Sequence, residues 1–164
     1  MKKLIIILAS IVLASCSERK IGYVNLQTVF NDFAYKKELE KELKGISNNR
    51  KYILDSLETQ VKMLIRKIQY DKTNKDLIAE YQTMKEIYLQ KKTVYGEEEQ
   101  RMVKLYDEKI LSQLNSYIKE YGKKEKLDMI YGANNAGNVM YADTSLDLTK
   151  PVVMYINEKF KGKN

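Results

Sequence analysis

Apolar residues recur at steps of three and four along a long central stretch of the chain, roughly from Tyr35 to Glu125. This spacing is that of an amphipathic helix, and its seven-residue repeat is typical of a coiled coil. One short polar segment, Asp71 to Asp76, interrupts the rhythm, and no proline does. A short connection between two helices favours antiparallel neighbours. The pattern therefore predicts a helical hairpin over residues 35–126 that turns near 71–76.

The apolar positions define an expected seam between the two helices. In the first helix it contains Leu39, Leu43, Ile46, Ile53, Leu57, Val61, Leu64 and Ile68, with Arg50 at one seam position. In the second it contains Leu77, Tyr81, Met84, Tyr88, Tyr95, Met102, Leu105, Leu111, Leu114, Ile118 and Tyr121, with Lys91 and Glu98 as polar interruptions. Because tyrosine, methionine and charged residues replace leucine, we do not expect a tight leucine zipper.

Further apolar residues lie off this seam, namely Ile65, Tyr70, Ile78, Ile87, Leu89 and Val94. Packing against the partner helix is the simplest explanation for any one of them. Together they are too many for a two-helix seam. Either other copies of the chain cover them, or they stay available to other proteins, for which methionine and tyrosine are adaptable contact residues.

The segments that flank the hairpin are expected to form one small body. A strand over Ile21–Asn25 leads into a short helix that buries Val29 and Phe33. After the hairpin, strands over 127–131 and 139–142 with a glycine- and asparagine-rich turn predict a β-hairpin. A closing helix would bury Leu148, Val152, Val153, Ile156 and Phe160. A three-stranded sheet this small is marginal alone, so self-association through the body is expected.

Three residues are expected to cap helices. Asn25 precedes the first short helix, and Thr149 precedes the closing helix, whose first turn contains the only proline, Pro151. At the tip of the hairpin the residues from Thr73 to Asp76 form a T-x-x-D capping box, which predicts Thr73 as the cap of the second long helix.

The first twenty residues are typical of an export signal. Two lysines precede an apolar run from Leu4 to Leu13, which is too short to span a bilayer. The run ends in Leu13-Ala14-Ser15-Cys16, which resembles a bacterial lipoprotein box and implies cleavage before Cys16 and lipidation of Cys16. An ordinary signal peptide with an incidental cysteine is the alternative. A lipid anchor would hold the protein on a membrane, with the outer membrane weakly preferred because Ser17 is not aspartate.

These elements define an α+β, predominantly helical fold: a long antiparallel coiled-coil hairpin on a small β-sheet body with short helices. We expect a signal peptide over 1–15 and a tether with the first strand and helix over 16–34. The hairpin arm would follow over 35–126, and the β-hairpin with the C-terminal helix over 127–164.

Composition narrows the possible functions. The chain has no histidine, no tryptophan and one cysteine, which leaves little material for a metal site or a nucleophile and makes an enzyme the least favoured class. The net charge is +7, and residues 36–72 hold ten basic against six acidic residues. A basic surface attracts nucleic acid, anionic lipid or acidic protein, and an export signal disfavours nucleic acid.

Two glycines, Gly45 and Gly96, lie inside the predicted helices. A hairpin folded about residue 74 would place them within about two turns of each other, and each costs about 1 kcal/mol relative to alanine in a helix. A soft zone where the arm bends is one explanation, and chance is the other.

The order of these parts resembles the OmpH/Skp family of periplasmic chaperones. The resemblance rests on Ile21–Asn25, on Val29-Phe30, on Leu127–Ile130 and Val139–Ala142, and on Asp147-Leu148-Thr149 with Val152-Val153 and Ile156-Asn157. It implies a homotrimer whose arms enclose a cavity and hold unfolded outer-membrane proteins in the periplasm, without ATP, a cofactor or nucleic acid. The lipoprotein box departs from the soluble members of the family.

On this resemblance the sites are assigned as follows. The client-binding set is Met63, Ile65, Tyr70, Ile78, Tyr81, Met84 and Tyr88. The residues for electrostatic attraction are Lys62, Arg66, Lys67 and Lys72. The trimer contacts of the body are Ile21, Tyr23, Ile130, Val139 and Tyr141, and the lipid site is Cys16. A coiled-coil envelope lipoprotein that tethers or spaces the envelope layers is the alternative function.

Overall fold

The computed structural model describes residues 19–134 and 137–162, so the predicted lipid site Cys16 lies outside the described residues. It contains two compact units. The arm comprises residues 34–113, and the body comprises the described residues up to Phe33 and from Leu114 onward. The predicted α+β, mainly helical fold with a long hairpin is confirmed.

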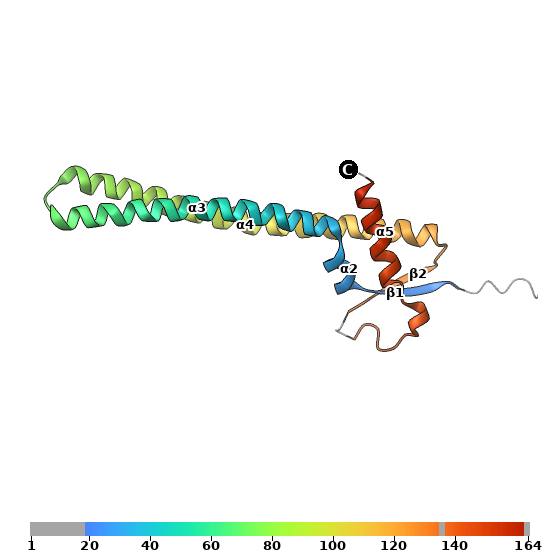
Figure 1. Cartoon of the computed structure of the whole chain (residues 1–164). Coiled ribbons are helices and arrows are strands. Elements are labelled where there is room, and N and C mark those ends of the chain that lie inside the picture. The colour runs from blue at the N-terminus through green and yellow to red at the C-terminus, as the bar shows by residue number, and fades with distance from the viewer. Residues whose placement is uncertain (1–18, 135–136, 163–164) are drawn as a thin grey trace, which may run out of the picture. The chain divides into compact units, whose positions relative to one another are not determined.

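The arm consists of helix α3 (Ala34–Tyr70) and most of helix α4 (Lys75–Lys124), which lie side by side (Figure 1). Their antiparallel register places Arg50 opposite Glu98 midway along them, with Arg50 Nη2 2.5 Å from Glu98 Oε2. No helix among the described residues contains an apolar stretch that could cross a membrane.

The tip of the hairpin is held by two side chains. Asp71 accepts hydrogen bonds from the Thr73 amide (3.3 Å) and hydroxyl (3.1 Å). Asn74 Oδ1 accepts from the Leu77 amide at 3.1 Å and so caps α4. The prediction of Thr73 as the cap is therefore wrong. Asn74 occupies the cap position, and the Thr73 hydroxyl is already used by Asp71.

The seam of the arm follows the predicted positions in α3, where all eight apolar residues are buried or half-buried. In α4 the prediction fails at two positions, because Leu105 and Leu111 are 47% and 49% exposed. Tyr106 and Ile110 are buried in their place. The cause is a run of four-residue steps from Met102 through Tyr106 and Ile110 to Leu114, which rotates the buried face of the helix relative to a strict seven-residue repeat.

The sheet of the body contains two parallel strands, β1 (Ile21–Asn25) and β2 (Met129–Ala133), with Ile21 opposite Met129 and Tyr23 opposite Tyr131. A parallel pair needs a long crossover connection, and the whole arm supplies it. The predicted β-hairpin is wrong, because residues 139–142 are in no strand of the described chain.

Two contacts explain why a hairpin does not form. Asn138 turns back onto the end of β2, where its side-chain amide donates to the Gly132 carbonyl and its Oδ1 accepts from the Asn134 amide at 3.0 Å. The second edge of β1 is used by a later segment, since Tyr23 forms a bridge with Asp147 and its carbonyl accepts from the Leu148 amide at 2.8 Å. The outer edge of β1 is therefore already taken, and the chain after β2 turns at Asn138 without pairing along β2.

The core of the body lies where the two short helices meet the sheet and the end of α4. Helix α2 (Leu26–Asp32) and helix α5 (Thr149–Lys161) lie beside the strands, and a 3-10 turn, η1 (Thr144–Leu146), precedes α5. The largest fully buried side chains, each under 2% exposed, are Val24, Val29, Phe33, Tyr117, Val152 and Ile156. They come from five segments and join both ends of the chain.

The predicted cap at Asn25 is confirmed, because its Oδ1 accepts from the Thr28 amide at 2.9 Å. The predicted cap at Thr149 is wrong, because Thr149 is the first residue of α5 and Leu148 occupies the cap position without a side-chain bond. The Thr149 hydroxyl instead accepts from the Asn25 amide at 2.8 Å. The threonine therefore ties the C-terminal helix to the first strand.

Candidate functional surfaces

The arm exposes an unusual number of large apolar side chains for a two-helix hairpin. They are Tyr52, Met63, Ile65, Tyr70, Ile87, Leu89, Val94, Val103, Leu105 and Leu111, and they range from 37% to 92% exposed. Exposed apolar surface often marks a site of interaction when it is contiguous, so these residues are candidates for contact with another protein.

The seven predicted client-binding residues fall into two groups. Met63, Ile65 and Tyr70 are 50%, 39% and 92% exposed near the end of α3. Ile78, Tyr81, Met84 and Tyr88 on α4 are half-buried. The first group is therefore open, whereas the second also contributes to the packing of the two helices.

The tyrosines of α4 carry lysines over their rings. Lys85 Nζ lies 5.8 Å from the ring centre of Tyr81, and Lys92 Nζ lies 5.8 Å from that of Tyr88. Such cation–π contacts are worth about 0.5–1 kcal/mol at exposed sites. They keep aromatic surface and positive charge next to each other along the helix.

A shallow groove of about 620 Å³ follows the outer side of α4, where Tyr81, Leu89 and Val94 contribute its apolar walls. Leu89 and Val94 were expected off the seam, but they were not assigned to the client-binding set. The groove that they line together with Tyr81 now adds them as candidates for the client-binding set. Tyr52, 76% exposed on α3, also lies off the predicted seam, but it was not included among the off-seam apolar residues.

The four predicted cations differ in how much charge they leave available. Lys62 Nζ lies 2.6 Å from Glu58 Oε1 on the same helix. The hydrogen bond in this pair raises the pKa of Lys62 and lowers that of Glu58, so the lysine charge is locally compensated. Arg66, Lys67 and Lys72 are exposed near the tip.

The polar interruption of the seam forms a specific cluster. Arg50 pairs with Glu98 and lies 5.1 Å from the ring centre of Tyr95, whose ring also has Lys91 Nζ at 5.6 Å. The Arg50 side chain is 18% exposed and that of Glu98 is 38% exposed. The middle of the arm is thus a partly exposed polar contact instead of an apolar layer.

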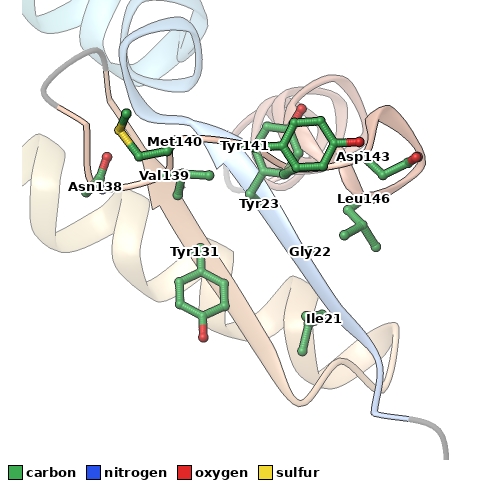
Figure 2. Close-up of a pocket in the computed structure, with 11 residues that line it drawn as sticks. Ile21, Gly22, Tyr23, Tyr131, Asn138, Val139, Met140, Tyr141, Asp143 and Leu146 are labelled. Atoms are coloured by element: carbon green, nitrogen blue, oxygen red, sulfur yellow. The ribbon is translucent and has the colours of Figure 1, made fainter.

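One face of the two-stranded sheet is apolar and open. Ile21, Met129 and Tyr131 are 42%, 48% and 49% exposed and alternate with the inward residues of their strands. Beside them runs a groove of about 700 Å³, whose lining includes Ile21, Tyr23, Tyr131 and the segment 138–143 (Figure 2). Met140 and Tyr141, at the rim, are 89% and 86% exposed.

Four of the five predicted trimer contacts, Ile21, Tyr23, Val139 and Tyr141, line this groove (Figure 2). Ile130 does not, because its register opposite Gly22 places it on the other face of the sheet. There its Cδ1 lies 3.4 Å from where a Cβ on Gly122 of α4 would stand. Ile130 therefore packs within the body.

Among residues 19–134 and 137–162, no group of three acidic, cysteine or histidine side chains is arranged to hold a metal ion.

A family model described as outer membrane protein (OmpH-like) matches residues 20–156, so the chain belongs to the OmpH-like family. The resemblance drawn from the sequence is thereby confirmed.

Curated relatives carry the name chaperone protein Skp. The relative from Yersinia enterocolitica is 26% identical over 149 residues, which cover 87% of this chain and 89% of that protein. The relative from Photorhabdus laumondii is 27% identical over 145 residues and covers 84% of this chain and 85% of its own. A crystal structure of an OmpH-like protein from Caulobacter crescentus matches with a TM-score of 0.73 at 15% identity, covering 87% of this chain and 86% of the other. That likeness supports the fold.

Proposed function

We propose that this protein is a periplasmic chaperone that holds unfolded outer-membrane proteins without using ATP. The observation that carries the proposal is the set of exposed apolar side chains on the arm, from Tyr52 to Leu111. A permanent coiled-coil spacer has no use for such residues, whereas a protein that binds unfolded chains needs them. The Skp relatives, which are named chaperones, support the same reading.

The chemistry of the arm suits weak and adaptable binding. Unfolded chains expose apolar segments in many sequences, and methionine and tyrosine can contact them without a fixed geometry. Exposed cations near the tip, such as Arg66 and Lys72, would attract acidic clients before contact. Salt should therefore slow the encounter more than it weakens the final complex. Release would follow client folding or transfer.

Self-association through the body completes the proposal. The open sheet face and the groove beside it present Ile21, Tyr131 and Tyr141 to water, and a neighbouring copy would cover them. In the homotrimer that the family resemblance implies, the arms would enclose a cavity for the client. The lipid on Cys16 would hold this assembly at a membrane, with the outer membrane preferred.

An aggregation assay tests the chaperone activity. The protein should keep an unfolded outer-membrane barrel protein dispersed at close to one trimer per client, as measured by light scattering. The triple variant Met63→Ser, Ile65→Ser, Tyr70→Ser should lose most of this protection, because it removes the open group on α3. Met154→Ser, a 56% exposed position on α5, is the matched control. If the unchanged protein gives no protection, the scaffold lipoprotein becomes the better assignment.

Sedimentation tests the assembly separately. Tyr141→Asp places a charge at the rim of the body groove and should shift the protein from trimer toward monomer. Met154→Asp adds the same charge at the exposed α5 position and should leave the mass unchanged. A monomeric unchanged protein, or equal behaviour of the two variants, would argue against association through the groove.

A further inference from the structure

The body begins only a few residues after the predicted lipid site. Lys20 is fixed to the body by two hydrogen bonds: its amide donates to Asp128 Oδ2 at 2.8 Å, and its carbonyl accepts from the Asp128 amide at 2.8 Å. Cys16 lies four positions earlier. Four residues span at most about 14 Å when fully extended. If Cys16 is lipidated, the surface around Lys20 and Asp128 therefore stays within about 14 Å of the anchored residue.

Basic residues gather at this same place. Helix α4 ends at Lys124, and the chain then turns tightly, with the Lys126 amide donating to the Lys123 carbonyl at 3.3 Å. The Leu127 amide donates to the Gly122 carbonyl at 2.9 Å, and Lys126 has a φ of 55°. This turn delivers the chain directly to Asp128 and hence to Lys20. The end of α4 and the start of β1 accordingly lie on one side of the body (Figure 1).

We define the basic patch as Arg19, Lys20, Lys123, Lys124 and Lys126, all of which are exposed. The acidic residues of the same turn neutralise the patch only in part. Glu125 pairs with Lys124 at 3.7 Å, and Asp128 accepts a hydrogen bond from the Lys20 amide, so five cations face two carboxylates. The patch therefore retains a surplus of positive charge at the point where the tether joins the body.

The dipole of α4 gives a simpler reason for part of this charge. Lysines in the last turn of a helix stabilise its negative end, which accounts for Lys123 and Lys124. Lys126 lies beyond the helix, and Arg19 and Lys20 belong to another segment of the chain. The dipole does not explain why these three cations are placed at the same site.

We propose that the basic patch is a membrane-facing surface that binds the headgroups of anionic phospholipids. The proposal rests on the anchoring part of the proposed function, which brings the patch within about two screening lengths of the bilayer, since this length is about 8 Å at physiological salt. Each basic residue near an anionic membrane strengthens binding roughly fivefold. The patch would thus orient the body with the end of α4 toward the lipid.

Vesicle flotation tests the patch without the anchor. The mature chain from residue 16, carrying Cys16→Ser, is mixed with vesicles of phosphatidylethanolamine and phosphatidylglycerol, or with phosphatidylcholine alone. We expect binding to the anionic vesicles, little binding to the neutral ones, and release at high salt. The variant R19Q/K123Q/K126Q should bind the anionic vesicles on the order of 100-fold more weakly. Lys124 is left intact because its Nζ lies 5.2 Å from the ring centre of Tyr155.

The matched control removes the same charge from the arm. The variant K41Q/K44Q/K51Q changes three exposed lysines of α3 and should weaken binding by less than about threefold if the patch is the binding surface. A second variant, R19Q/K20Q, leaves the turn after α4 untouched and should weaken binding roughly 25-fold. Circular dichroism verifies that each variant keeps its helix content.

Two results would overturn the proposal. The first is a failure of the unchanged mature chain to prefer anionic vesicles at low salt. The second is an equal loss of binding in the patch and arm variants, which would assign the effect to net charge. The aggregation assay tests chaperone activity separately. All of these variants retain the client-binding residues of the arm, so they should still prevent aggregation even if membrane binding is lost.

Discussion

The body and the arm bury their side chains to different depths. The body has six large side chains below 2% exposure, and rings such as Phe33 and Tyr117 meet edge to face with their centres 6.1 Å apart. In the arm the most deeply buried apolar residues are Leu39, Leu64, Tyr106 and Ile110, at 2% to 9%. Most other seam residues are half-buried. Depth of burial thus separates a fixed structural unit from one whose contacts remain partly open.

The difference shows how one chain can combine definite assembly with indefinite binding. A close-packed core responds to the loss of a single methylene group, so the body has one arrangement. Two helices joined by half-buried tyrosine, methionine and an ion pair tolerate many small rearrangements. We therefore expect substitutions to act differently in the two units, and the variants below test this expectation.

The largest difference is expected for the same deletion made in both units. Ile156→Ala removes a fully buried side chain from the body and should lower the free energy of unfolding by about 2–5 kcal/mol. Ile53→Ala removes a half-buried side chain from the arm and should cost about 1–2 kcal/mol. Urea denaturation followed by circular dichroism measures both. Similar losses would remove the distinction between a packed core and an open seam.

Glycine replacement should change stability in opposite directions. A Cβ on Gly22 in β1 would stand 2.3 Å from Leu148 Cδ1, so Gly22→Ala should destabilise the body by about 1–3 kcal/mol. A Cβ on Gly45 or Gly96 meets nothing within 4 Å. Gly45→Ala and Gly96→Ala should each stabilise the arm by up to about 1 kcal/mol.

The arm glycines also test the bending hypothesis. With no steric need for glycine at either position, helix softening is the remaining structural effect of Gly45 and Gly96. Replacing both with alanine should narrow the distance distribution between spin labels at the tips of two arms. An unchanged distribution would leave chance as the explanation for the two glycines.

The ion pair in the middle of the arm should contribute modestly. Glu98→Gln should cost less than about 1 kcal/mol, because partly exposed pairs are screened by water and salt. Replacing both Arg50 and Glu98 with leucine should instead stabilise the arm, since an apolar layer needs no desolvation of charge. Thermal melting at low and high salt separates the two effects. A large, salt-independent loss for Glu98→Gln would show a tighter arm than its exposure indicates.

The smallest effect is a loss of stability at alkaline pH. Burial is the main cause that raises the pKa of Tyr106 in the arm and of Tyr121 in the body above the ordinary value near 10. In both cases the folded state holds the phenol proton more tightly. The stabilisation is complete below about pH 10 and is lost as the pH rises through the folded-state pKa.

Tyr106→Phe and Tyr121→Phe should each flatten the fall of the melting temperature between about pH 9 and 11. Asp143→Asn is the control, because it removes a carboxylate from the exposed surface and leaves both tyrosines in place. In the unchanged protein this carboxylate accepts a hydrogen bond from the Ser145 amide. A melting temperature that falls equally in all variants would assign the loss to other groups.

The hairpin was predictable because its periodicity extends over many turns and no proline breaks it. The identity of individual buried residues within the hairpin was harder to predict. Leu105 and Tyr106 are adjacent apolar residues, and Tyr106 is the buried one because it belongs to a continuous run of four-residue steps. The cap of α4 was also ambiguous, because Thr73 and Asn74 can both cap a helix. Asn74 is the cap in the structure, since the Thr73 hydroxyl is hydrogen-bonded to Asp71.

The body shows a different limit. Residues 139–142 have strand-like composition, but a strand forms only where an unpaired edge is available. Asn138 and the segment at Asp147 decide this through contacts that no local pattern reveals. Four of the predicted body contacts lie together along the groove beside the sheet. Ile130 lies on the other face of the sheet, because the direction of its side chain depends on the register that pairs it with Gly22.

The parallel pairing of β1 and β2 has a consequence for the order of folding. The pairing joins Lys20 to Asp128 across 108 positions of the chain. Closing a disordered loop of that length costs entropy, and folding rates fall as contacts become less local. The two long helices need mainly local contacts and can form and pair first, which brings distant segments near each other. In a chain that emerges from a translocation channel starting at its N-terminus, β1 must therefore wait for nearly the entire protein before it finds its partner strand.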